Sequence, residues 1–331
     1  LELYVYMGEE SDWAPLIKFL ETHEPPRVNI TIDAEYPVVT AEKGWGLISV
    51  TVPRQGGAAP GQPALTAFGG GFFNSQIPED ASAAIDNATP ALEARIRKRA
   101  AKQTGMRYTY AWQGRQLKLR ALGVSAHSSK PEDGVNAISM LADALRVHPW
   151  RGTAAGELVN FLNELVGTGI HGEKFGRIAY RDAFMGPMTV APTVIQQLDD
   201  GIQLNINVRR PQGKSREQLT AEAEAALKQW QTRRVKLANV KLELGDPWVQ
   251  KSAPHVPTLL SVFSFFTGIQ DAKPISIGGG TNARLFPGAV TFGPAMPGTV
   301  YSGHSEHEFI TLKQLLLNLE MYTAVMVELA R

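Results

Sequence analysis

The chain has 331 residues, enough for two domains, and 44% of them are hydrophobic, which excludes a disordered chain. Its 33 basic and 32 acidic residues nearly cancel, which argues against nucleic-acid or membrane-surface partners, because such binding depends on excess positive charge. Cysteine is absent from the sequence, so disulfides, thiolate metal sites and a cysteine nucleophile are excluded. No stretch approaches 18 consecutive apolar residues, and we expect no transmembrane helix.

The first forty residues follow the order strand, helix, strand. Residues 1–7 (LELYVYM) predict a buried strand, residues 12–21 a helix with one apolar face, and residues 28–32 a second strand. This order is typical of a parallel α/β sheet. Because the first predicted strand begins at residue 1, we expect the chain to start inside a domain whose N-terminal part is missing.

From residue 44 onward strands and helices alternate in mixed order, which is typical of an α+β domain. The α/β style returns near residue 255. We therefore predict an α/β domain with a mixed, mainly parallel sheet, formed by residues 1–45 and 254–331 and interrupted by an α+β insert of residues 46–253. The predicted strands are 46–52, 117–124, two within 190–206, 240–244, 274–277 and 290–292, and the predicted helices are 81–104, 135–146, 217–232, 258–267 and 312–331.

Three carboxylates follow the first two predicted strands. Glu9 and Glu10 stand at the end of the first strand, where open α/β sheets bind ligands, and Asp33 follows the second. Of two adjacent carboxylates, one can bind a metal ion while the other takes a proton from metal-bound water. Neighbouring parallel strands would bring Glu10 and Asp33 to one sheet edge. The alternatives are a solvated surface pair for Glu9 and Glu10, and a turn or capping role for Asp33.

Two histidines occur in polar segments. His304 lies with His307 in a loop of Gly, Ser, His and Glu residues before the last predicted helix, and imidazole and carboxylate ligands suit zinc or a related divalent ion. A surface loop with a capping role is the alternative. His127 follows a predicted strand and could donate a hydrogen bond to a developing oxyanion, or it is a plain turn histidine.

Arginine and glycine supply groups that can bind a carboxylate. Arg209 ends a predicted strand and could hold a carboxylate with two hydrogen bonds; its alternative is an ordinary surface arginine. The segment Ile277–Arg284 (IGGGTNAR) lacks the Gly-Lys-Ser/Thr signature of a phosphate loop. Its three glycines permit close backbone approach, and exposed N–H groups can hold a carboxylate. The run Gly69–Asn74 (GGGFFN) allows the same argument.

Eight short motifs resemble, in their order along the chain, those of the co-catalytic zinc aminopeptidase/aminoacylase superfamily. The string DAEYPV..AEKG and the large insert are most similar to its dipeptidase branch, with the carnosinases and the PepV-type bacterial dipeptidases. The resemblance implies a phosphorylase/hydrolase-like catalytic domain and makes the insert a lid domain. The motifs lie at Gly8–Ser11, Asp33–Gly44, Gly69–Ala81, Gly123–Ile138, Asn207–Gly213, Gly278–Arg284, Phe292–Pro294 and His304–Glu308.

The resemblance also implies a role for each matching residue in the hydrolysis of dipeptides. Glu9 would be the general base, and His127 would polarise the scissile carbonyl group from the lid. The predicted ligands of two zinc ions, or of manganese or cobalt in their place, are Glu10, Asp33 and His304. The groups predicted to hold the substrate's C-terminal carboxylate are Asn74, Arg209 and the backbone of Gly278, Gly279 and Gly280.

The family's His-x-Asp motif and metal-bridging Asp have no counterpart before Glu9, so the resemblance also predicts a missing N-terminal part. The large lid resembles two lid-like halves in one chain, which favours a monomer in which His127 serves its own site. A cytoplasmic location is favoured, with a periplasmic one if a signal peptide lies in the missing part. Two alternative functions stay open: deacylation of N-acyl amino acids on the same scaffold, and a non-catalytic ligand-binding or assembly module.

Overall fold

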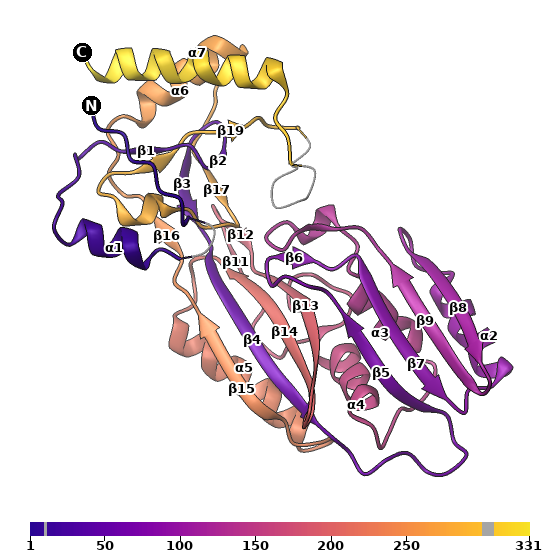
Figure 1. Ribbon diagram of the computed structural model, residues 1–331. Helices are drawn as coiled ribbons and strands as arrows, with labels where there is room; N and C mark the ends of the chain where they lie inside the picture. Colours follow the sequence, from indigo (N-terminus) through magenta and orange to yellow (C-terminus); the bar gives the residue numbers. More distant parts are fainter. Residues whose placement is uncertain (10–11, 300–307) are drawn as a thin grey trace. The chain divides into compact units, whose positions relative to one another are not determined.

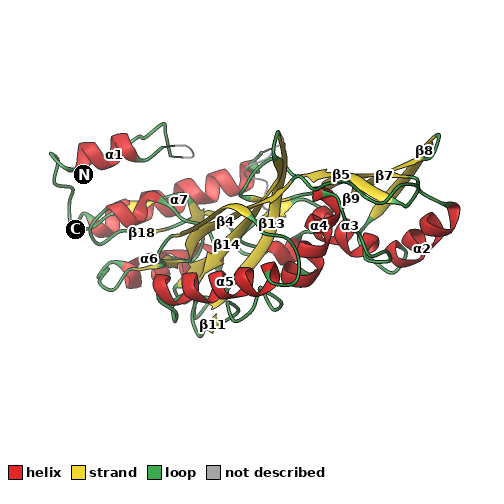
Figure 2. Cartoon of the chain, turned by 90° about the horizontal axis from the view of Figure 1, so that it is seen from below, coloured by secondary structure: helices red, strands yellow, loops and turns green. Residues whose placement is uncertain are grey.

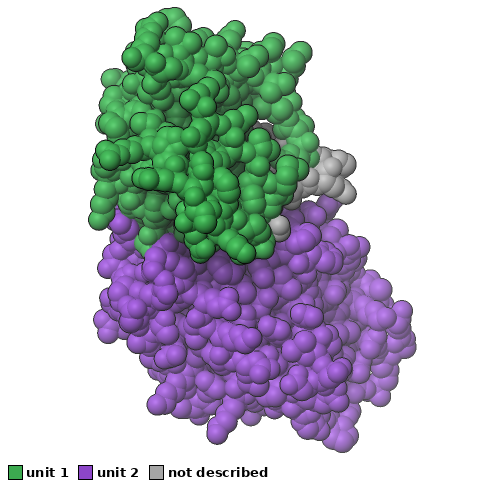
Figure 3. All heavy atoms as spheres, turned by 60° about the vertical axis from the view of Figure 1, so that its left-hand side comes forward, with its two compact units in different colours: residues 1–43, 183–185, 247–331 green, residues 44–182, 186–246 purple. Residues whose placement is uncertain are grey.

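The computed structural model describes residues 1–9, 12–299 and 308–331. The chain divides into two compact units, shown in different colours in Figure 3. Unit 1 comprises residues 1–43, 183–185 and 247–331, and unit 2 comprises residues 44–182 and 186–246. The sequence predicted boundaries after residues 45 and 253. Among the described residues, no helix has the length and apolar character needed to cross a bilayer.

Unit 1 contains a five-stranded mixed sheet with short strands (Figure 1). β1 pairs with β18 and β17 with β3 in parallel, whereas β16 and β18 each pair with β3 in antiparallel orientation. A separate parallel pair joins β2 and β19. The strands are β1 (Ile30–Thr31), β2 (Ala34–Glu35), β3 (Val39–Glu42), β16 (Trp248–Val249), β17 (Ile275–Ile277), β18 (Val290–Thr291) and β19 (Pro294–Ala295).

The helices of unit 1 are α1 (Ala14–Leu20), α6 (Val256–Thr267), η3 (Asn282–Leu285) and α7 (Leu312–Leu329). α6 and α7 pack together around a core that includes Tyr36, Phe292 and Met321. The Thr311 side chain accepts the N–H of Gln314 and so caps the start of α7. The helices α6 and α7 confirm the two helices predicted at residues 258–267 and 312–331, and each boundary agrees within two residues.

The predicted strand over residues 1–7 is wrong. These residues are irregular, and Leu1, Leu3, Val5 and Met7 are exposed. Only one side of the segment packs, through Tyr4 and Tyr6, against the small core that α1 contributes to. The sequence shows the alternation of a strand, but no strand among the described residues forms a ladder with it, so the backbone pairing that defines a strand is absent.

Unit 2 is an eight-stranded antiparallel sheet with the order β15-β4-β14-β13-β5-β7-β9-β8. It has two four-stranded halves, because β13 and β5 share a single register pair, Ile195 with Gly70. The strands are β4 (Gly44–Pro53), β5 (Ala64–Gly70), β7 (Asp80–Asp86), β8 (Arg107–Gln113), β9 (Gln116–Leu122), β13 (Thr189–Leu198), β14 (Gly201–Arg210) and β15 (Ala238–Leu244). The two-stranded ladders are β6 (Gln76–Ile77) with β10 (Ala126–His127) and β11 (Arg181–Asp182) with β12 (Gly186–Pro187).

The helices of unit 2 cover one face of this sheet (Figure 2). They and the inward sheet face enclose one continuous hydrophobic core, with Phe161, Trp150 and Trp230 among its largest buried side chains. Four helices begin with a side-chain cap that accepts a backbone N–H: Thr89 for α2, Asn136 for α3, Thr153 for α4 and Ser215 for α5. The helices are α2 (Pro90–Ala100), η1 (Pro131–Asp133), α3 (Ala137–Leu145), α4 (Ala154–Phe161), η2 (Leu162–Val166) and α5 (Arg216–Gln231).

The predicted helix over residues 81–104 is wrong in its first half. Residues 80–86 form strand β7, in which Ala81, Ala83 and Ile85 are buried and alternate with more exposed neighbours. The helix α2 starts only after a turn at Asn87, which has a φ of +50°. Alanine favours helices, but alternate burial against the core decides the conformation here, because tertiary packing overrides weak local propensity.

Candidate functional site

The long strand β14 separates apolar and polar residues by its alternation. Ile202, Leu204, Ile206 and Val208 belong to the hydrophobic core, and the residues between them are polar. Successive side chains of a strand point to opposite faces, so the second set lies on the face opposite the core. This set is Gln203, Asn205, Asn207 and Arg209.

Arg209 is 4% exposed. Its Nε donates to the Asn207 Oδ1 atom at 3.0 Å, and its Nη2 donates to the Ser128 hydroxyl oxygen at 3.1 Å. The alternative of an ordinary surface arginine is therefore wrong. These two hydrogen bonds, from Nε and Nη2, orient the guanidinium, a planar group that can make a two-pronged contact with a carboxylate.

His127 lies in the short strand β10, opposite Gln76 of β6. Its Nδ1 is 2.6 Å from the Ser129 hydroxyl oxygen, and it accepts the backbone N–H of Ser129 at 3.3 Å. A neutral imidazole whose Nδ1 accepts a hydrogen bond carries its proton on Nε2. The Nε2–H group is thereby the donor that could serve an oxyanion.

Asn74 follows β5 and is oriented by a neighbour on β14. The Asn205 Nδ2 donates to the Asn74 Oδ1 at 3.0 Å, while the Asn205 Oδ1 accepts from the Ser49 hydroxyl at 2.9 Å and from the Gln203 Nε2 at 3.3 Å. In this series of hydrogen bonds, the Asn74 side chain takes part through its carbonyl oxygen. Its NH₂ end is the one suited to donate to a carboxylate.

Three of the predicted site residues are thus linked within unit 2. The backbone N–H of Ser128 donates to the Ser75 carbonyl oxygen at 2.8 Å, which ties the His127 segment to the chain next to Asn74. The Ser128 hydroxyl in turn accepts from Arg209. An amide, an imidazole N–H and a guanidinium are donor groups of the kinds that can bind a carboxylate or a developing oxyanion.

Sequence reasoning missed three residues that hold this arrangement. They are Ser128, Asn205 and Asn207, of which Ser128 and Asn207 are each 1% exposed. The signal for Asn205 and Asn207 was the polar–apolar alternation over residues 202–209, since a polar residue at every second position on a strand marks a polar face. Ser128 has no such signal, because its role depends on where a distant strand places Arg209.

The predicted metal-binding residues lie in unit 1 or outside the described residues. Glu10 and His304 are outside them. Glu9 is half-buried in a turn, and its carbonyl oxygen accepts the Trp13 Nε1–H at 2.6 Å. Asp33 is exposed and stands between β1 and β2. Within residues 1–9, 12–299 and 308–331, no group of three His, Cys, Asp or Glu residues could hold a metal ion. Because Glu10 and His304 lie outside these ranges, the predicted zinc site stays a prediction.

The glycine loop at 278–280 leads into a network around the carboxylate of Glu42, which sequence reasoning did not single out. Glu42 is fully buried. Its Oε1 accepts the Thr281 backbone N–H at 3.0 Å and the Thr281 hydroxyl at 2.6 Å. Its Oε2 accepts the Nε and Nη2 of Arg284 at 2.9 and 2.7 Å.

This network anchors the loop end. A Cβ atom added at Gly280 would lie 3.8 Å from the Glu42 Oε2 and 3.5 Å from the Arg284 Nη2. Burial raises the pKa of Glu42 above its ordinary value, while Arg284 and the Thr281 hydrogen bonds act in the opposite direction. Thr281 and Arg284, which follow the three glycines, thus bind a carboxylate of the protein itself.

Comparisons with known proteins agree with the resemblance. Residues 115–232 match the family model of the M20 peptidase dimerisation domain. A Bacillus subtilis protein named "Putative dipeptidase YtjP" is 29% identical over 340 residues, covering 100% of this chain and 70% of its own length. The Beta-Ala-Xaa dipeptidase of Lactobacillus delbrueckii is 28% identical, covering 98% of this chain and 67% of its own length.

Among solved structures, human carnosine dipeptidase 1 matches 98% of this chain and 64% of its own chain, with 11% identity and a TM-score of 0.41. The chain thus spans about two thirds of the length of these proteins. The family model and the two curated relatives confirm the resemblance to the dipeptidase branch of the co-catalytic metallopeptidases. The structure confirms the predicted fold class of a mixed α/β protein with an α+β insert. In unit 1, two of the four ladders of the larger sheet are parallel.

Proposed function

We propose that this chain is the substrate-binding lid and part of the catalytic domain of a metal-dependent dipeptidase. The observation that carries the proposal is the linked cluster of Asn74, His127 and Arg209 in unit 2, which offers donors for one carboxylate and one oxyanion. A dipeptide has both features, a free C-terminal carboxylate and a scissile carbonyl one residue away. The dipeptidase names of the relatives support the same reading.

Each residue of the cluster has a distinct task in this proposal. The guanidinium of Arg209 and the amide NH₂ of Asn74 bind the substrate carboxylate and set its register. The His127 Nε2–H donates to the carbonyl oxygen as it gains negative charge, and this interaction strengthens toward the transition state. Ser128, Asn205 and Asn207 position these groups through the hydrogen bonds already described.

The residues of unit 1 complete the proposal. Glu10, Asp33 and His304 would hold two divalent ions, zinc or manganese or cobalt, which supply a water of lowered pKa when bound. Glu9 would take and return the proton as general base. The N–H groups of Gly278–Gly280 would contribute to carboxylate binding beside the loop end that Glu42 fixes. A single chain acting as a monomer stays part of the proposal.

The test is hydrolysis by the full protein of three matched substrates: Ala-Ala, its C-terminal amide, and N-acetyl-alanine. We expect hydrolysis of Ala-Ala that chelator abolishes and Zn²⁺ restores, with much slower hydrolysis of the amide. Faster release of alanine from N-acetyl-alanine would replace the dipeptidase by a deacylase. Ala-Ala hydrolysis that is indifferent to chelator, or its absence with metal supplied, would contradict the proposal.

A further inference from the structure

A concave surface of unit 2, separate from the cluster of Asn74, His127 and Arg209, is lined mainly by cations. It has a volume of about 700 Å³, and its lining residues are Arg151, Asn163, Glu164, Lys174, Arg233 and Arg234. Four of these six side chains are cationic and one is acidic. Because the whole sequence is nearly neutral, this is a local concentration of positive charge, and its volume is within the range of small-molecule sites.

The single acid of the lining is already engaged. The Glu164 carboxylate accepts from Arg234 and from the Trp230 Nε1–H, the latter at 3.0 Å. The nearby Glu157 accepts from Asn160 and acts on Arg234 electrostatically. By contrast, Arg151 and Arg233 are exposed, and within the described part of the chain neither side chain makes a hydrogen bond or ion pair. The uncompensated charge of the cavity therefore resides mainly in these two guanidinium groups.

The cavity wall is built on a rare backbone element. Asn163 and Glu164 lie in the π-helical turn η2, which is closed by the Gly167 N–H bonding the Leu162 carbonyl oxygen at 2.6 Å. π-turns are uncommon and often occur at functional sites. Gly167 has a φ of +73°, and an added Cβ there would lie 2.9 Å from the Cδ of Lys174. Because Gly167 has no side chain, the methylene groups of Lys174 can pack directly against its backbone.

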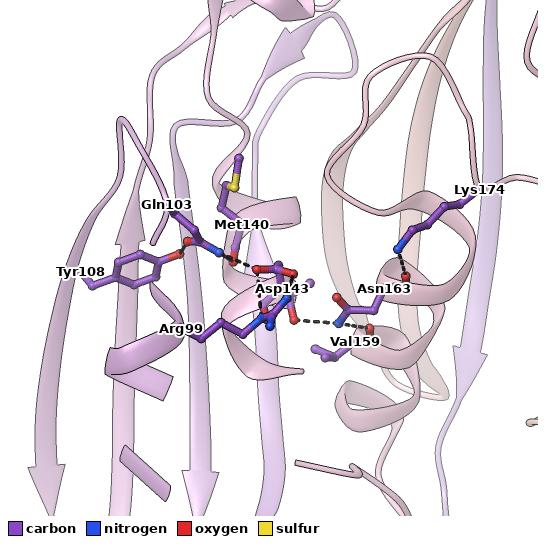
Figure 4. Close-up of polar contacts among 9 residues, drawn as sticks. Arg99, Gln103, Tyr108, Met140, Asp143, Val159, Asn163 and Lys174 are labelled. Atoms are coloured by element: carbon purple, nitrogen blue, oxygen red, sulfur yellow. Dashed lines mark hydrogen bonds and ion pairs between the residues drawn. The ribbon is translucent and has the colours of Figure 1, made fainter. Parts of the chain in front are cut away.

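Figure 4 shows how this wall is held. The Lys174 Nζ donates to the Asn163 carbonyl oxygen at 3.0 Å, and the Asn163 side chain donates to the carbonyl oxygens of Ala142 and Val159 at 2.7 and 2.9 Å. The next residue of α3, Asp143, pairs with Arg99. Lys174 is therefore attached to the core helices rather than to a loose surface loop.

We propose that this cavity binds a diphosphate group, either inorganic or as part of a larger phosphorylated molecule. Two uncommitted guanidinium groups and one ammonium match the charge and the oxygen-rich surface of two adjacent phosphates. None of the lining side chains is aromatic, and Trp230 behind the wall is fully buried, so the cavity offers no aromatic surface on which a nucleobase could stack. This inference does not rest on the dipeptidase proposal.

The test measures binding of pyrophosphate, ADP and citrate to the full protein by titration calorimetry, with excess chelator so that bound metal does not contribute. The variant is the double substitution Arg151→Ala/Arg233→Ala, and the matched control is Arg95→Ala, an exposed arginine on α2 outside the cavity. Both sites of the variant are exposed, so folding should be preserved, and the unfolding temperature without ligand checks this.

We expect pyrophosphate and ADP to bind with affinities within about threefold, and the double variant to lose at least about tenfold for both, while the control is unchanged. Binding should weaken as salt rises, because exposed charges are screened. Absence of pyrophosphate binding, equal loss in the control, or no loss in the double variant would overturn the proposal. Binding of ADP without pyrophosphate, or of citrate as tightly as pyrophosphate, would overturn the diphosphate assignment.

Discussion

The two units place their predicted site residues in different ways. In unit 2, Arg209 stands on a ten-residue strand whose alternation defines a polar face. In unit 1, Glu9 and Asp33 stand in turns, and the strands near them are two to four residues long. A long strand fixes side-chain direction through its own geometry, whereas a turn residue depends on whatever contacts it. Disturbing each unit should therefore have different consequences.

The largest effect is expected from unit 2. Arg209→Lys keeps a positive charge but loses the two-pronged contact, so kcat/KM for Ala-Ala should fall about a hundredfold, or ~3 kcal/mol. The C-terminal amide of the same dipeptide should be affected much less. Kinetics on both substrates check this, with Arg120→Lys on β9, 60% exposed, as the control. Equal losses on both substrates would show that Arg209 does not read the carboxylate.

In unit 1, the largest expected effect of a substitution is on the stability of the fold. Glu42→Ala leaves Arg284 without its partner and removes the acceptor of the two Thr281 bonds, so the free energy of unfolding should fall by roughly 3–5 kcal/mol. Glu42→Gln should cost less, because its amide oxygen can still accept from Thr281. Denaturant unfolding measures both variants. The control is Glu328→Gln, whose partner Arg331 is 70% exposed and which should cost below ~1 kcal/mol.

A smaller effect concerns pH. Burial lowers the pKa of His255, at 3% exposure, below its ordinary value of 6.5. A lowered pKa means that the folded state binds fewer protons than the unfolded state, so stability is present above pH 6.5 and is lost as the pH falls through the folded-state pKa. His255→Leu should reduce this loss. Unfolding temperatures between pH 7.5 and 4.5 test it, and an unchanged slope would assign the acid sensitivity to other groups.

His148 of unit 2 gives the matched comparison. Its pKa is also lowered, chiefly by burial and further by Arg95. His148→Leu should therefore reduce the same acid sensitivity in unit 2. If only one of the two substitutions flattens the profile, the unit that contains it is the one that limits stability in acid.

The sequence predicted most of the α-helices but missed α4 and several strands, among them β3, β5 and β8. α3, α5 and α7 agree with the predicted ranges to within two residues at every end, because each has an apolar periodicity and a capping side chain at its start. The two segments predicted with the wrong conformation, residues 1–7 and 81–86, share one cause. Both depend on whether a partner strand is present, and that is a property of the fold rather than of the segment.

The site was predictable to a similar degree. Asn74, His127 and Arg209 were singled out, and the structure brings them together. Asn205, Asn207 and Ser128 were not, since neutral polar residues gain a role only from the groups they touch. Glu42 was missed for the same reason: its partners Thr281 and Arg284 come from a segment far along the chain. The assignments of Glu10 and His304 stay predictions.

The two halves of the unit 2 sheet also differ in when they can form. The strands β5, β7, β9 and β8 all come from residues 64–122, so this half can close soon after it is synthesised. β4 spans residues 44–53, but its partners β14 and β15 begin at residues 201 and 238. During synthesis β4 therefore lacks both partner strands, with Ile48, Val50 and Val52 unburied, until at least residue 210 has been made. We infer that β4 is where a nascent chain is most exposed to aggregation and most in need of a chaperone.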